Sequence, residues 1–156
     1  MDWKQLVRFV LVGGNLEPYA ILLVRILLGL FFAISGGYKL FVGSRTESMF
    51  QTLVAAKVPL PRLMTYFVSS VEFVGGMLLI IGFLTSLASA ALLTDMVVAI
   101  LTAKLSAMPK GLSPFDWLDN FLYLPEVLYI VLFVWLICSG PGRFSIDYVV
   151  AARLSR

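Results

Sequence analysis

The stretch that decides the fold is 63–105, LMTYFVSSVEFVGGMLLIIGFLTSLASAALLTDMVVAILTAKL, which is almost uninterrupted in its hydrophobicity. Its charged residues are Glu72, Asp95 and Lys104. As a single helix, at 1.5 Å per residue, the stretch would be about 60 Å long, roughly twice the hydrocarbon thickness of a bilayer. We therefore predict two membrane spans, 63–83 and 86–105, joined by a tight turn where glycine, threonine and serine gather.

Two further apolar stretches flank this region, at 19–41 and 122–139. The predicted fold class is therefore all-α: a four-transmembrane-helix bundle with short interfacial helices. We assign 19–156 to this membrane domain and 1–18 to an N-terminal interfacial segment, because the latter is amphipathic and breaks at a glycine pair. Four spans place both termini on one side. Basic residues divide fairly evenly between the two sides, and we predict cytoplasmic termini.

The amino-acid composition is that of a membrane protein. Of the 156 residues, 60% are hydrophobic and 13% are charged, whereas about 25% are charged in a typical soluble domain. A water-soluble fold of this size could not bury so much apolar surface. The composition excludes a disordered chain, an ordinary cytosolic enzyme and a nucleic-acid-binding domain, so the expected partner of the surface is the lipid bilayer and not nucleic acid.

The reactive side chains also limit the chemistry. The chain has no histidine, which excludes histidine-ligated haem, the usual zinc and copper sites, and a Ser-His pair. Its single cysteine, Cys138, cannot form an internal disulfide or a two-cysteine redox relay. We predict no catalytic residue and no metal site. If the protein takes part in redox chemistry, a partner or a bound organic cofactor must carry the electrons.

Charged residues inside the spans are the most informative positions, because a charge near the bilayer centre normally faces the bundle interior with a partner. Counting from the span ends puts Arg25 and Asp95 at compatible depths, and we predict that they pair. The same count predicts a second cluster of Lys39, Glu72 and Glu126 near the opposite surface. Acids then exceed bases by one, and we expect Glu72 to hold a proton or a hydrogen-bonding ligand.

Simpler interpretations of these charges stay open. The Arg25–Asp95 pair could be only a structural staple between helices. Lys104 could extend to the lipid headgroups, and Glu126 follows a proline at a helix start, where a carboxylate suits the helix dipole. The tyrosines Tyr38, Tyr123 and Tyr129 lie near the second cluster and could line a pocket, although tyrosines also populate the membrane–water interface.

Several segments resemble the DoxX family of small four-helix membrane proteins. They are 23–29 (LVRILLG), 37–41 (GYKLF), 71–79 (VEFVGGMLL) and the closing 140–147 (GPGRFSID). The resemblance covers most of the chain, although relatives often carry a histidine near the end of the third span that is missing here. It implies that Arg25, Lys39, Glu72, Arg143 and Asp147 are the characteristic residues. Arg143 and Asp147, four residues apart, are expected to lock the tail helix against the bundle or to contact a headgroup or partner.

The resemblance implies an accessory subunit of a membrane-associated oxidoreductase system in a bacterial or archaeal cell membrane. On this hypothesis the protein has no catalytic activity of its own, contacts quinone, and works with a soluble or membrane redox enzyme. A homo-oligomer is also compatible with the sequence. The alternative hypothesis is a small membrane transporter, or a lipid- or quinone-binding protein, that uses the charged cluster inside the membrane.

Overall fold

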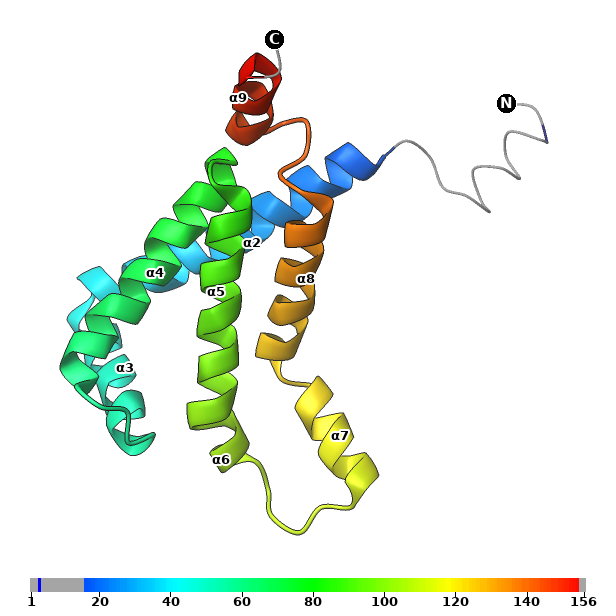
Figure 1. The fold of residues 1–156 in the computed structure, drawn as a ribbon. Coiled ribbons are helices and arrows are strands. Elements are labelled where there is room, and N and C mark those ends of the chain that lie inside the picture. Colours follow the sequence, from blue (N-terminus) through cyan, green and yellow to red (C-terminus); the bar gives the residue numbers. More distant parts are fainter. Residues whose placement is uncertain (1–2, 4–15, 155–156) are drawn as a thin grey trace.

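The computed structural model describes residue 3 and residues 16–154, and this part of the chain is a bundle of helices (Figure 1). The predicted interfacial segment 1–18 therefore lies almost entirely outside the described residues, and Glu17 already belongs to the first helix. The elements are α2 (Glu17–Phe41), α3 (Gly43–Ala55), α4 (Pro61–Ile81), α5 (Thr85–Ala99), a π-helical segment η1 (Ile100–Lys104), α6 (Leu105–Ala107), α7 (Pro114–Leu122), α8 (Pro125–Ser139) and α9 (Ile146–Leu154).

Three of these helices are long and apolar enough to cross a membrane: α2, α4, and the continuous helix Thr85–Ala107 that α5, η1 and α6 form together. The fourth apolar region is divided into α7 and α8, which meet at an angle of 63°. Alone, α8 is 15 residues long, or about 22 Å, which is shorter than the hydrocarbon core. The chain is thus an all-helical membrane bundle, with a fourth span if the bent pair is counted as one.

A tight turn joins α4 to α5, as the sequence predicts. Gly82 and Leu84 both adopt left-handed backbone conformations, with φ of 69° and 50°. Gly82 ends α4 and donates its N–H to the carbonyl of Leu78 at 2.9 Å. Only three residues separate the two helices, so they run antiparallel and stay in contact.

Glycines allow α2 and α4 to pack with their backbones nearly touching. A Cβ atom on Gly29 would come within 2.8 Å of the Gly76 carbonyl oxygen, and one on Gly76 would overlap the backbone nitrogen of Ala33. Such close contact between helices favours small residues at the interface. It fixes α2 against α4, and so brings side chains at matching depths on these two helices face to face.

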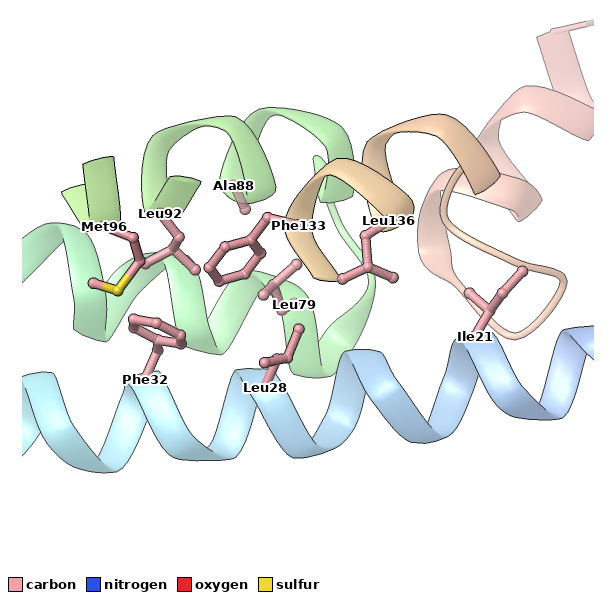
Figure 2. Close-up of a cluster of buried hydrophobic side chains, with 9 residues drawn as sticks. All are labelled: Ile21, Leu28, Phe32, Leu79, Ala88, Leu92, Met96, Phe133 and Leu136. Atoms are coloured by element: carbon pink, nitrogen blue, oxygen red, sulfur yellow. The ribbon is translucent and has the colours of Figure 1, made fainter. Parts of the chain in front are cut away.

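The apolar core lies between α2, α4, α5 and α8 (Figure 2). Phe32 of α2, Leu79 of α4, Leu92 of α5 and Phe133 of α8 are all almost fully buried. The outer surface is also rich in large apolar side chains, such as Leu87, which is 64% exposed. Large exposed apolar patches are rare on water-soluble monomers, so these outer faces suit contact with lipid.

Candidate functional site

A cavity of about 630 Å³ opens between α2, α3, α4, the α5–η1 helix and α8, at the end of the bundle that α3 covers. Its walls are mainly apolar, and all three carboxyl groups in its lining come from membrane helices. The polar lining includes Lys39, Glu72, Asp95, Lys104 and Glu126. A largely apolar cavity with a few convergent polar groups is the usual form of a small-molecule site.

Lys39 of α2 and Glu72 of α4 form an ion pair in this cavity, which confirms the predicted pairing of these two residues. The Lys39 Nζ atom lies 2.6 Å and 2.7 Å from the two carboxylate oxygens of Glu72. Glu72 is 4% exposed, so this pair is shielded from solvent on the acid's side. The close approach of α2 and α4 explains why the two side chains meet.

Asp95 of α5 lines the same cavity, and the predicted Arg25–Asp95 pair is wrong. Arg25 instead donates hydrogen bonds to the backbone carbonyls of Pro141 and Phe144. The Oδ2 atom of Asp95 is buried and has no hydrogen-bond partner among the described residues. Asp95 therefore has a hydrogen-bond acceptor that no described residue uses, which is unusual for a buried polar atom.

Glu126 of α8 pairs with Lys104 of η1 at 2.8 Å, and not with Lys39 as predicted. The simple interpretation of Lys104 as a side chain that only extends to headgroups is also wrong, although the Lys104 side chain remains 41% exposed. The Glu126 Oε2 atom is buried without a partner within the described part of the chain. Both Glu126 and Lys104 line the cavity. The predicted cluster of Lys39, Glu72 and Glu126 therefore lies in one cavity, but Glu72 and Glu126 pair with different lysines.

The charged side chains in the cavity lining are the three carboxyl groups of Glu72, Asp95 and Glu126 and the three amines of Lys39, Lys57 and Lys104. The excess of one acid that the sequence predicts is therefore not found in the lining. Glu72 is held by both oxygens, whereas Asp95 has no ion pair in the described residues. Of these three carboxyl groups, Asp95 rather than the predicted Glu72 is the one without an ion pair in the described structure.

Aromatic rings form one wall of the cavity. Phe31 and Phe32 of α2 pack against Tyr129 of α8, with ring centroids 4.9 Å and 5.4 Å apart. Of the three tyrosines predicted to line a pocket, only Tyr129 is in the cavity lining. Tyr38 and Tyr123 are 57% and 82% exposed and are not among the lining residues, in keeping with their alternative interpretation as interface residues.

The third span changes its helical form where it borders the cavity. Ile100–Lys104 is wound as a π-helix, and Thr102, Ala103 and Lys104 of this segment line the cavity. π-Helical turns are rare in helices and often occur at functional sites. The wide turn displaces these side chains from the positions that a continuous α-helix would give them, and no feature of the sequence indicates it.

Arg25 belongs to a second cluster, which joins the C-terminal segment to the bundle. It is 2% exposed and donates from Nη1 to Pro141 at 2.6 Å and from Nη2 to Phe144 at 2.5 Å. These carbonyls lie where the chain leaves α8, so helix formation does not satisfy them. The guanidinium therefore replaces backbone hydrogen bonds at this end of the membrane domain.

Asp147 of α9 completes the lock on the tail. Its two carboxylate oxygens accept hydrogen bonds from the backbone N–H groups of Leu84 and Thr85, both at 2.8 Å. Burial alone would raise the pKa of Asp147, but these hydrogen bonds and the nearby charge of Arg25 lower that pKa below its ordinary value. Arg143 is exposed, so Arg25 rather than Arg143 is the basic residue of this lock.

Comparison with known proteins agrees with this architecture. The family model of DoxX matches residues 20–105, which include α2, α3, α4, α5 and η1. The chain belongs to the DoxX family. The cavity residues Lys39, Glu72, Asp95 and Lys104 fall inside the matched region, whereas Glu126 and the tail lock residue Asp147 lie beyond it.

Two relatives of this DoxX protein are informative. An uncharacterized membrane protein of Mycobacterium tuberculosis is 29% identical over 142 residues, which cover 87% of this chain and 84% of the relative. CatD of Bacillus subtilis, whose name carries a provisional assignment as an oxidoreductase, is 31% identical over 97 residues, covering 62% of this chain and 69% of CatD. No solved structure matches the chain.

Proposed function

We propose that this DoxX-family protein is a quinone-binding membrane subunit that works with an oxidoreductase partner. The observation that carries the proposal is the cavity of about 630 Å³ between its membrane helices, with one aromatic wall and several charged side chains in its lining. Quinones dissolve in the bilayer, so a site that opens among membrane helices is accessible to them. The apolar walls suit the ring and its tail, and the polar groups suit the ring oxygens.

The donors available in the cavity match a quinone carbonyl. An ammonium group has three N–H donors, and Lys39 gives two of them to Glu72, which leaves one for a ligand. Lys104 gives one donor to Glu126. The flat ring can pack against Phe31 and Tyr129, and the flexible side chains of Met64 and Met96 can adapt to a tail.

An oxidoreductase partner follows from the side chains that the sequence lacks. The chain contains no histidine and a single cysteine, so it offers neither a histidine-ligated metal centre nor a pair of thiols. Among residues 3 and 16–154, no group of His, Cys, Asp or Glu side chains is placed to hold a metal ion. The electrons that a bound quinone exchanges would then come from a separate redox enzyme. The name of the relative CatD supports a link to oxidoreductase chemistry.

A matched pair of tryptophan variants tests the binding half of this proposal. Ala103 of η1 lines the cavity, whereas Ala107, four residues further along the same helix, is exposed. We expect Ala103→Trp to weaken decylubiquinone binding in lipid nanodiscs by at least about tenfold, because the indole fills the space of the ring. Ala107→Trp should bind as the wild type does. Absence of saturable binding to the wild type, or equal binding to both variants, would refute the proposal.

Purification in mild detergent tests the partner. We expect the native protein, isolated from its own membranes, to retain a redox enzyme, and the complex to reduce or oxidise decylubiquinone while the isolated subunit does not. Quinone turnover by the isolated subunit would contradict the accessory role.

A further inference from the structure

We infer that the cavity selects the reduced, hydroxyl-bearing form of its ring ligand, a quinol, over the oxidised quinone. This inference rests on the proposed function and concerns the redox state that the site prefers. The preference comes from the buried polar atoms of the residues that line the cavity, because those without a partner in the described structure are acceptors.

Two carboxyl oxygens in the cavity are buried without a donor in the described structure: Oδ2 of Asp95 and Oε2 of Glu126. They lie on different helices, α5 and α8, and both residues line the cavity. Each residue's position is fixed by its helix, and Glu126 is also held at Oε1 by Lys104. Buried polar atoms are nearly always paired in folded proteins, so two such atoms in one cavity indicate a ligand that donates.

A protonated carboxyl group does not satisfy both oxygens. The cavity lining holds three carboxyl groups and three amines, so its charges balance without a bound proton. A proton taken up by Asp95 or Glu126 would occupy one oxygen only. At least one buried acceptor then still lacks a donor, and leaving such a group unsatisfied is costly.

A quinone offers only carbonyl oxygens, which accept hydrogen bonds and cannot donate them. A quinol offers two hydroxyl groups, each of which both donates and accepts. One hydroxyl can donate to Asp95 and accept the remaining N–H of Lys39, so the quinol uses a donor and an acceptor of the site together. The aromatic wall of Phe31, Phe32 and Tyr129 contributes equally to both forms because it contacts only the ring.

The test measures binding of three matched ligands to the wild-type protein in nanodiscs under anaerobic conditions. They are decylubiquinol, decylubiquinone, and the O-methylated quinol, which has the reduced ring without a hydroxyl donor. We expect decylubiquinol to bind at least about tenfold more tightly than the other two, as expected for one hydrogen bond to a charged acceptor. Equal binding of the quinol and its O-methylated form would overturn the inference.

Two aspartate variants locate the effect. Asp95→Asn keeps the shape of the side chain but adds a donor, and we expect it to reduce the preference for the quinol to within about threefold. Asp119→Asn removes an exposed aspartate of α7 and should leave the preference unchanged. An unaltered preference in Asp95→Asn would overturn the assignment of Asp95.

The failure of this inference is distinguishable from the failure of the proposed function. If all forms of the ring bind with equal affinity, the site is a quinone site without redox selectivity. If none of them binds, both proposals fall. Binding of decylammonium that is tighter than binding of decylubiquinol would also overturn the inference, because it would show that the carboxyl groups recognise positive charge instead of a hydroxyl group.

Discussion

Replacing Arg25 by methionine tests how the tail is held to the bundle. Methionine keeps an unbranched side chain that suits an apolar interior but removes the guanidinium. Two hydrogen bonds from a charged donor are lost, at 2.6 Å to Pro141 and 2.5 Å to Phe144. Each such bond contributes about 1.5–3 kcal/mol, so we expect the free energy of unfolding to fall by about 3–6 kcal/mol. Solvent cannot replace them, because Arg25 is 2% exposed.

The assay is unfolding in mixed micelles by SDS titration, followed by tryptophan fluorescence. Arg45→Met, at an exposed position of α3, is the matched control and should change the free energy of unfolding by less than about 0.5 kcal/mol. Arg25→Lys should fall between the two, because one ammonium cannot reproduce the forked geometry that reaches both carbonyls. A loss below about 1 kcal/mol for Arg25→Met would show that these hydrogen bonds do not hold the tail to the bundle.

Three further variants test separate contacts. Lys39→Met leaves the Glu72 carboxylate buried without its partner and should lower the free energy of unfolding by about 3–5 kcal/mol, with partial recovery when Glu72→Gln is added; unchanged stability would argue against the ion pair. Gly76→Ala should cost about 1–3 kcal/mol in the same assay because α2 and α4 must separate, whereas Gly43→Ala, with no atom within 4 Å of its new Cβ, should be neutral; equal stabilities would exclude the close packing. Asp147 has a pKa below its ordinary value, so its contribution is present at neutral pH and is lost as the pH falls below about 4. Asp147→Asn should therefore unfold more easily at neutral pH and show a flatter acid transition, and identical acid profiles for both proteins would contradict the lock.

The membrane helices and the turn between α4 and α5 are predictable from the sequence because they depend on length and hydrophobicity alone. The Lys39–Glu72 pair is predictable for a related reason. Both residues lie toward the same membrane surface, the long side chain of Lys39 can reach Glu72, and glycines such as Gly76 mark the faces on which α2 and α4 meet. A contact between two side chains can thus be predicted when the sequence indicates both their depth in the membrane and which two helices pack together.

The partner of Arg25 could not be predicted, because it is the backbone. Matching depths suggested Asp95, but depth does not specify the direction in which a side chain points around its helix. The carbonyls of Pro141 and Phe144 became acceptors when α8 ended, and carbonyls are not visible in a pattern of side chains. An arginine in a membrane helix can thus donate hydrogen bonds to the unpaired backbone carbonyls beyond a helix end, and not only to a carboxylate.

The ion pair of Glu126 with Lys104 escaped prediction for a different reason. It depends on the π-helical segment Ile100–Lys104, which displaces Lys104 from its place on a regular α-helix. No residue of this segment is a proline or glycine that would indicate the irregularity. The cavity itself also depends on α3 covering the end of the bundle, which the apolar pattern of the chain does not specify.

Photolabelling with an azido-quinone in membranes tests the central claim most directly, because it shows where a ring ligand resides. We predict that the labelled peptides contain cavity residues, Phe31–Lys39 on α2 and Asp95–Lys104 on the third span, and that excess decylubiquinol prevents the labelling. Labelling confined to lipid-facing positions such as Leu87, and insensitive to decylubiquinol, would contradict a ligand site between the helices.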